Sequence, residues 1–284
     1  MSWVNPGPAW LFCPADRPER FEKAAAVADV VILDLEDGVA SADKEAARTA
    51  LIDTQLDPER TIVRINPVGT DDYEKDLLAL DGTRYNRLML PKCESAEQVL
   101  SLAPLEVIAL VESPLGALAV EDIALAASTI GVMWGAEDLV ASLGGNASRH
   151  SDGTYRDVAR HVRSRSLLAS KGYHRLALDS VYLDIADLDG LKHEALDSVA
   201  VGFDVKVAIH PSQIAVIRAA YAPTEDEVDW AKRVLAAVET ERGVFAFEGK
   251  MVDAPVLRHA ERVLERAAKV ERSASSAEKK EASE

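Results

Sequence analysis

The chain has 284 residues, of which 48 are acidic and 32 basic, so its formal net charge is −16. This length fits one large domain or two small ones, and α/β barrels often reach it as a single domain. Hydrophobic residues make up 48%, too many for a disordered chain. The negative charge argues against sequence-independent nucleic-acid binding, which depends on contacts of Lys and Arg with phosphates, and against docking on an anionic membrane.

The two cysteines, Cys13 and Cys93, are too few for a disulfide framework or a four-thiolate zinc site. Both lie in apolar runs, which is typical of buried thiols in a reducing compartment. Residues 1–8 contain neither the basic region nor the apolar run of a signal peptide. Because no stretch reaches the ~18 apolar residues of a membrane span, we expect a cytoplasmic protein.

Short runs rich in Val, Ile and Leu alternate with longer runs of helical period, such as 18–28, 43–52 and 156–171. The candidate strands are residues 10–15, 30–36, 61–66, 87–92, 107–113, 131–137, 176–184 and 205–211. Alternation of strand and helix implies a parallel sheet, and eight such units predict a (β/α)₈ TIM barrel over residues 9–221. An open doubly wound sheet is the alternative, but the glycine-rich phosphate loops that mark such folds do not occur here.

A C-terminal helical extension is expected over residues 222–270. Thr224 and Glu227 form a capping box that opens a helix over 225–242, and an extended connection over 244–251 leads to a last helix over 254–269. Residues 271–284 contain no large apolar side chain, so we expect them to form a disordered tail.

Ionisable residues end most of the predicted strands, at the rim where TIM barrels carry their active sites. These residues are Asp34, Glu36 and Asp37 after strand two, Arg64 in strand three, Lys92 after strand four, Glu112 after strand five, Glu137 and Asp138 after strand six, and His210 after strand eight. Burying such charges is costly unless they are paired or bound to a metal. The convergence therefore predicts an active site at this rim.

Glu112 and Asp138 end neighbouring strands and suit a hard divalent cation. Mg²⁺ is usually held by one or two carboxylates, with waters and substrate oxygens completing its octahedral shell. No metal-ligand spacing of histidines or cysteines favours zinc. The alternative for both residues is a loop cap or a salt bridge.

Arg64 lies within an apolar strand, so its guanidinium must meet an anion, either on a ligand or on a protein carboxylate. Glu36 and Asp37 are adjacent and would point to opposite sides if the strand persisted, so that one could orient water at the metal while the other faced the helices. Lys92 could pair with Glu36 or Glu112. A structural role is the better interpretation for His210.

Asp253 precedes Ala-Pro and the last helix, so its position alone indicates an N-cap.

Taken together, the chain resembles the citrate lyase β-subunit-like family of the HpcH/HpaI aldolase group over residues 9–268. The resemblance rests on residues 11–21 (LFCPADRPERF), 32–39 (ILDLEDGV), 63–66 (VRIN), 90–92 (LPK), 135–139 (GAEDL), 208–213 (AIHPSQ) and 249–255 (GKMVDAP). One departure follows Glu112: many relatives have a Glu-Thr-Ala-Arg-Gly-like run, and here Pro114 and Leu115 precede Gly116 without an arginine. The departure leaves substrate preference within the family open.

The resemblance implies a Mg²⁺-dependent carbon–carbon lyase with Glu112 and Asp138 as metal ligands. It makes Arg64 the group that binds the substrate carbonyl and steadies an enolate, and Asp253 the acid/base. In relatives the C-terminal segment reaches a neighbouring subunit's site, which implies a homo-oligomer, a trimer or a hexamer. Arg17 and Arg20 are similar to positions that meet coenzyme A phosphates, although exposed helix-end arginines are the alternative.

The function hypothesis is a lyase acting on 3-hydroxyacyl-CoA thioesters of the citramalyl-, malyl- or 3-hydroxy-3-methylglutaryl-CoA type, with an acetyl-CoA enolate as intermediate. Glu36 and Asp37 are further catalytic candidates. Two alternatives remain: a citrate lyase β-subunit acting on a carrier-protein thioester, and a metal-dependent aldolase acting on free hydroxy-keto acids.

Overall fold

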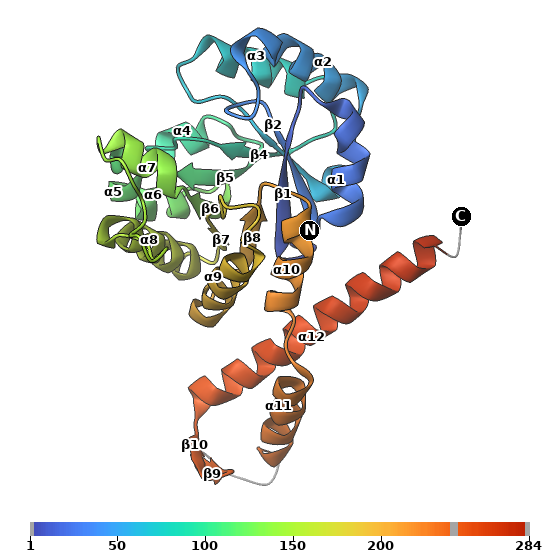
Figure 1. Cartoon of the computed structure of the whole chain (residues 1–284), viewed down its shortest axis with the longest axis vertical. Coiled ribbons are helices and arrows are strands. Elements are labelled where there is room, and N and C mark those ends of the chain that lie inside the picture. Colours follow the sequence, from blue (N-terminus) through green and yellow to red (C-terminus); the bar gives the residue numbers. More distant parts are fainter. Residues whose placement is uncertain (1–2, 239–243, 282–284) are drawn as a thin grey trace. The chain divides into compact units, whose positions relative to one another are not determined.

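The computed structural model describes residues 3–238 and 244–281, with side chains up to residue 270. Within this part of the chain, eight parallel strands form a closed barrel in chain order, and β1 pairs with β8 to close it (Figure 1). The strands are β1 (Ala9–Pro14), β2 (Val30–Asp34), β3 (Thr61–Arg64), β4 (Arg87–Leu90), β5 (Glu106–Val111), β6 (Thr129–Trp134), β7 (Leu176–Asp179) and β8 (Val205–Ala208). The predicted TIM barrel is confirmed.

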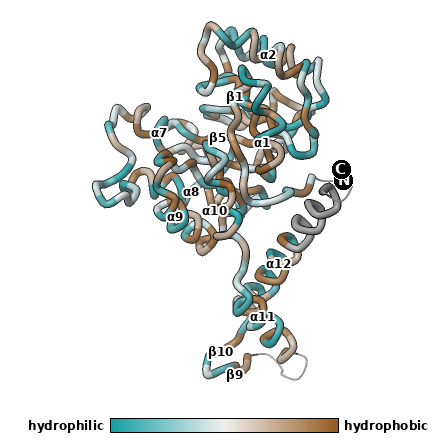
Figure 2. The backbone as a smooth tube through the Cα atoms, turned by 45° about the vertical axis from the view of Figure 1, so that its right-hand side comes forward, coloured by the Kyte–Doolittle hydropathy of each residue, from teal (hydrophilic) through white to brown (hydrophobic). Residues whose placement is uncertain are grey.

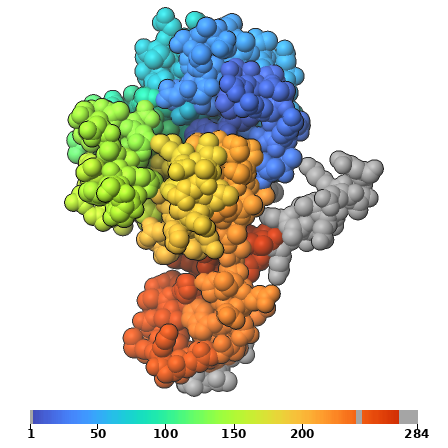
Figure 3. All heavy atoms as spheres, viewed as in Figure 1, coloured from blue at the N-terminus to red at the C-terminus, as the bar shows by residue number. Residues whose placement is uncertain are grey.

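Helices connect the strands and cover the outside of the barrel, as the strand–helix alternation predicts. They are η1 (Pro18–Arg20), α1 (Phe21–Val27), η2 (Ser41–Asp43), α2 (Lys44–Asp53), η3 (Pro58–Arg60), α3 (Asp71–Leu80), α4 (Ala96–Leu100), α5 (Pro114–Leu118), α6 (Val120–Leu125), α7 (Ala136–Ser142), α8 (Asp157–Gly172), α9 (Leu188–Val201) and α10 (Ser212–Tyr221). In Figure 3 the surface of the barrel changes from blue through green to yellow as successive units follow one another.

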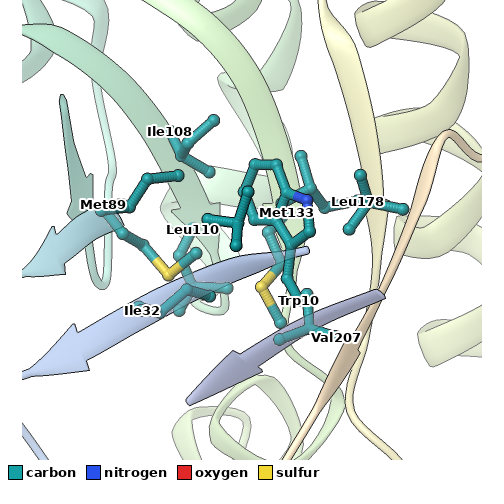
Figure 4. Close-up of a cluster of buried hydrophobic side chains, with 11 residues drawn as sticks. Trp10, Ile32, Met89, Ile108, Leu110, Met133, Leu178 and Val207 are labelled. Atoms are coloured by element: carbon teal, nitrogen blue, oxygen red, sulfur yellow. The ribbon is translucent and has the colours of Figure 1, made fainter. Parts of the chain in front are cut away.

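The barrel interior is filled by apolar side chains from all eight strands. The buried cluster includes Trp10, Ile32, Ile62, Met89, Ile108, Leu110, Met133, Leu178, Val205 and Val207 (Figure 4). Strands that are buried on both faces read as continuous apolar runs, which is why the sequence located them. Cys13 and Cys93 are free and buried, as predicted.

The strands end earlier than predicted, and β2 shows why. The Asp34 carboxylate accepts hydrogen bonds from the backbone N–H groups of Glu36 and Gly38, both at 2.9 Å. These bonds turn the chain directly after the strand, so the predicted alternation of Glu36 and Asp37 does not hold. The Asp34 carboxylate thus determines the backbone conformation at the rim and also contributes negative charge there.

A buried ion network joins strands β7 and β8 to helices α8 and α9. The Lys206 ammonium lies 2.6 Å from Glu194 Oε1 and 3.5 Å from Asp179 Oδ2, and neither Lys206 nor Asp179 is exposed. Arg163 adds two hydrogen bonds to Asp179, of 3.1 and 2.9 Å. Although burial acts to raise it, the pKa of Asp179 is held well below its usual range by Lys206 and Arg163.

The chain divides after Ile217, within α10, into two units. The second unit contains α11 (Glu225–Ala237), the antiparallel pair β9 (Phe245–Phe247) and β10 (Lys250–Val252), and α12 (Ala254–Glu281). The predicted capping box at Thr224 is present. Brown and teal alternate along α11 and α12 in Figure 2, because each helix has one apolar face.

The apolar faces of this second unit meet in a small core of Ala231, Val234, Val252, Ala260 and Val263. Helix α12 runs on to Glu281, through residues that composition assigned to a disordered tail; Ala, Glu and Lys, which dominate there, favour helix. Residues 282–284 and 239–243 lie outside the described residues, and the latter include the end of the expected helix 225–242. Among the described residues, no helix is both long and apolar enough to cross a membrane.

Candidate active site

The Lys92 ammonium lies among carboxylates that follow different strands at the C-terminal rim of the barrel. It pairs with Glu36 Oε1, and it lies 3.3 Å from Asp37 Oδ2 and 3.7 Å from Asp138 Oδ1. These carboxylates follow β2 and β6, and Lys92 itself follows β4. The rim therefore brings together residues that are distant in sequence, as their strand-end positions suggested. Both Glu36 and Asp37 face Lys92, whereas an unbroken strand would have separated them.

The backbone of Lys92 reaches a further carboxylate of the same rim. Its φ angle is 49°, in the left-handed region that side chains other than glycine seldom adopt. In this conformation the Lys92 N–H donates a hydrogen bond of 3.0 Å to Glu112 Oε1. Unusual backbone conformations of this kind gather at functional sites, where surrounding contacts hold them. Lys92 thus orients Glu112 with its main chain while its side chain contacts the other carboxylates.

The Arg64 guanidinium is held in one orientation by three contacts. Its Nε donates to Asp34 Oδ1 at 2.7 Å, a terminal nitrogen donates to Asp34 Oδ2 at 2.6 Å, and the other lies 2.9 Å from Glu36 Oε2. Its central carbon lies 4.6 Å from the centre of the Phe12 ring. Burial opposes the charge, but Asp34 and Glu36 raise the pKa of Arg64 above its already high value. The internal ion pair considered as an alternative is present, and it still leaves guanidinium N–H groups for a ligand.

Glu112 is 4% exposed, and its environment strongly disfavours its charged form. Burial, together with the negative charges of Asp138 and Glu36, raises its pKa to about 8, against the opposing effect of Lys92 and Arg64. A Cβ on Gly135 would lie 2.7 Å from Glu112 Oε2, so only glycine lets the chain before Asp138 pass so close to this carboxylate. The site thus presses carboxylates together, which a divalent cation would stabilise.

The donor set fits Mg²⁺. Glu112 and Asp138 offer carboxylate oxygens, and Mg²⁺ takes its remaining ligands from water and substrate. In the part of the chain that the structure describes, no group of three or more His, Cys, Asp or Glu side chains is arranged to hold a metal ion. Two carboxylates are as many protein ligands as Mg²⁺ usually takes.

The run after Glu112 begins helix α5. The Ser113 hydroxyl accepts the Gly116 N–H at 3.2 Å and donates to Glu94 Oε1 at 2.7 Å. A Cβ on Gly116 would lie 2.2 Å from the Cys93 carbonyl oxygen, so only glycine fits at this position. Leu115, which stands where the compared run has its arginine, is 60% exposed.

Other predicted residues lie away from these contacts. Arg17 and Arg20 are exposed around η1, each 3.8 Å from its acidic neighbour in sequence. Glu137 accepts a hydrogen bond from Ser148. His210 is exposed, and its Nδ1 lies 2.8 Å from Ser212 Oγ.

Asp253 belongs to the second unit, where its Oδ1 accepts the Val256 N–H at 3.4 Å at the start of α12. The capping role indicated by its position is therefore present. Its role as an acid/base stays a prediction.

Two functional positions received no role from sequence reasoning: Asp34, which orients Arg64, and Gly135, which admits Glu112. Asp34 could have been found because it is a carboxylate at the end of an apolar run, like the guanidinium of Arg64 in the next run along the chain. Gly135 gave no comparable signal, since the need for glycine arises from a contact with a residue on another strand.

A TIM barrel with a carboxylate pair and a fixed guanidinium at its C-terminal rim has the arrangement of a metal-assisted enzyme. The chain belongs to the HpcH/HpaI aldolase/citrate lyase family, a family of carbon–carbon lyases, whose model matches residues 9–211. The resemblance found in the sequence is thereby confirmed.

Relatives with assigned names agree with this membership. The chain is 66% identical over 261 residues to a citrate lyase subunit beta-like protein of Mycobacterium tuberculosis, covering 92% of this chain and 96% of that protein. It is 30% identical over 290 residues to the human mitochondrial citramalyl-CoA lyase, covering 90% and 84%. A solved structure of Mycobacterium tuberculosis CitE, in complex with magnesium, acetoacetate and coenzyme A, matches with a TM-score of 0.90 at 66% identity, covering 92% and 98%.

Proposed function

We propose that this carbon–carbon lyase is Mg²⁺-dependent and cleaves a 3-hydroxyacyl-CoA thioester of the citramalyl-, malyl- or 3-hydroxy-3-methylglutaryl-CoA type. The products would be acetyl-CoA and a keto acid. The observation that carries the proposal is the buried Glu112 beside Asp138, in a chain 66% identical to a protein solved with magnesium and coenzyme A. The citramalyl-CoA lyase relative supports the substrate class.

Glu112 and Asp138 would hold the metal. When bound, Mg²⁺ supplies a Lewis acid and a template for the carboxylate and carbonyl oxygens of the keto acid. Glu36 and Asp37, both oriented by Lys92, offer acceptors at the same rim for a substrate hydroxyl or for water. One of them would take the hydroxyl proton as the carbon–carbon bond breaks.

Arg64 supplies fixed positive charge where the acetyl-CoA enolate develops. Two of its N–H groups are committed to Asp34, and the guanidinium has five in total, so donors remain for the thioester oxygen. Because the guanidinium is already oriented, it stabilises the enolate without reorganising during the reaction. Asp253 would then protonate the methylene carbon to give the acetyl group.

The partners follow from the same proposal. Arg17 and Arg20 are exposed near the end of β1, where they are available to coenzyme A phosphates. Asp253 would act in a neighbouring subunit's site, so we propose a homo-oligomer, a trimer or a hexamer.

The name of the Mycobacterium tuberculosis relative favours one alternative, a β-subunit that acts on a thioester carried by a partner protein. An aldolase acting on free hydroxy-keto acids uses the same enolate chemistry.

The test is a product assay on the purified full chain, with a panel of CoA thioesters and the corresponding free acids, with and without Mg²⁺. We expect release of acetyl-CoA from one thioester, abolished by a chelator and by Glu112→Ala or Asp138→Ala. Turnover of free acids alone would establish the aldolase. Activity restricted to a carrier-protein thioester would establish the β-subunit.

A further inference from the structure

Lys92 is the charged residue through which the carboxylates of the rim are connected, and the mechanism above gives its charge no chemical task. Its ammonium contacts Glu36, Asp37 and Asp138, and its charge also reaches Glu112. Its side chain is 35% exposed, so the ammonium lies at the mouth of the rim rather than in the barrel core.

The Lys92 ammonium and a divalent cation would both interact with the carboxylate of Asp138. Asp138 Oδ1 lies 3.7 Å from the Lys92 Nζ, at the outer limit of an ion pair, while Glu36 is in direct contact. A metal held by Glu112 and Asp138 would therefore lie close to a fixed positive charge. Like charges this close repel appreciably even where solvent screens them.

We propose that Lys92 is a built-in counter-cation that shares Asp138 with the divalent ion and thereby limits how tightly the ion binds. The inference rests on the proposed Mg²⁺ site. Lys92 thus acts in two opposite ways: it stabilises the crowded carboxylates before the metal binds, and it weakens the metal's hold. Lys92 is a positioning residue, because it acts through Glu36, Asp138 and Glu112 rather than on the substrate.

If Lys92 served only to hold the carboxylates of the rim in place, a different result would be expected. Its loss would destabilise the rim, and metal binding would weaken or stay unchanged as the ligands lost their order. Competition predicts that the loss of the charge makes metal binding tighter. The sign of the change in Mg²⁺ affinity therefore separates the two interpretations without any measurement of activity.

The experiment measures the Mg²⁺ dissociation constant of the full chain by titration calorimetry, and the melting temperature in chelator and in Mg²⁺. For Lys92→Met we expect about tenfold tighter Mg²⁺ binding, because a positive charge near the metal is gone. We also expect a lower melting temperature in chelator and a larger rise on adding Mg²⁺. If Lys92→Met does not fold, Lys92→Gln carries the same expectations, since its amide can still donate to Glu36.

Two controls fix the interpretation. Lys92→Arg keeps the charge and should bind Mg²⁺ like the wild type, and Lys75→Met removes an exposed lysine of α3 and should change neither quantity. Unchanged or weaker Mg²⁺ binding in Lys92→Met would overturn the role of Lys92 while leaving the metal site intact. A wild type that binds no Mg²⁺ would overturn the metal site itself, and the competition with it.

Discussion

Asp34 and Arg64 meet fork to fork, with two hydrogen bonds of 2.7 and 2.6 Å between the guanidinium and the two carboxylate oxygens. They end adjacent strands and are partners in the register of β2 and β3. Such bidentate pairs fix orientation as well as charge. The same Asp34 carboxylate accepts two backbone N–H groups that turn the chain toward Glu36, so one side chain sets both the rim loop and the guanidinium.

Asp34→Asn should therefore lower activity and stability together. An amide cannot give Arg64 two charge-assisted acceptors, and it turns an NH₂ group toward the guanidinium. We expect the free energy of unfolding to fall by about 2–3 kcal/mol, and kcat to fall more than KM changes. Denaturant unfolding and steady-state kinetics check this. Asp53→Asn, at an exposed position near the end of α2, is the matched control and should behave like the wild type.

Gly135→Ala tests the close approach to Glu112. The new methyl group would lie 2.7 Å from Glu112 Oε2, so the carboxylate must move. We expect at least tenfold weaker Mg²⁺ binding, with a loss of stability of about 1–3 kcal/mol from overpacking. Calorimetric titration with Mg²⁺ measures the first effect and denaturant unfolding the second.

Gly172→Ala is its control, because nothing lies within 4 Å of a Cβ at that position. Mg²⁺ binding equal to the wild type in Gly135→Ala would show that the approach of Gly135 does not position Glu112.

The barrel and the composition of its rim could be predicted from sequence because both depend on local pattern. Buried parallel strands are continuous apolar runs, and residues that end them must meet at one rim whatever their exact pairing. Glu112, Asp138 and Arg64 were found in this way. The end of β2 was misplaced because it depends on whether the Asp34 side chain bonds to the backbone beyond it, which apolar periodicity does not encode.

The pairing of charges within the rim could not be predicted. Lys92 had two candidate partners, and the structure uses both, Glu36 through the side chain and Glu112 through the backbone N–H. That outcome depends on a left-handed backbone conformation at a lysine, which residue type disfavours. The length of α12 was underestimated for a different reason. The residues after position 270 have no large apolar side chains with which to pack against the rest of the unit. Helix propensity alone can nevertheless extend a helix that has already begun.

The raised pKa of Glu112 predicts how stability depends on pH in the presence of a chelator. The pKa is near 4.5 in the unfolded chain and about 8 in the folded one, so between these values the folded state binds the extra proton. The free energy of unfolding should therefore fall as pH rises through this window. Mg²⁺ needs the charged carboxylate, so its affinity should increase over the same range.

Glu112→Gln should remove this contribution to the pH slope, since an amide does not titrate. Denaturant unfolding in chelator at pH 5.5, 6.5 and 7.5 compares the two proteins. Equal slopes in wild type and variant would contradict the assignment of the raised pKa to Glu112. Groups that do not interact with Glu112 titrate alike in both, so the difference between the slopes reports this carboxyl and the rim groups coupled to it.

The buried Lys206 should matter far more for stability than an exposed lysine in a comparable pair. Lys206→Met leaves Asp179 and Glu194 without its charge inside the barrel wall, which should cost about 3–5 kcal/mol. Lys171 lies 2.6 Å from Asp204 but is 43% exposed, so Lys171→Met should cost at most about 1 kcal/mol. Denaturant unfolding of both variants gives the comparison, and similar losses would contradict the structural importance of the network.

Asp253 has one role that the structure contains and another that the proposed mechanism assigns to it, and two substitutions separate them. Asparagine caps helices as well as aspartate does, but it cannot exchange a proton. Asp253→Asn should keep the stability of α12 and lose at least a hundredfold in kcat. Asp253→Ala should lose the same activity and also about 1 kcal/mol of stability with the cap. Full activity in Asp253→Asn would reduce Asp253 to a helix cap, because this substitution keeps the cap and removes the proton exchange that the reaction requires.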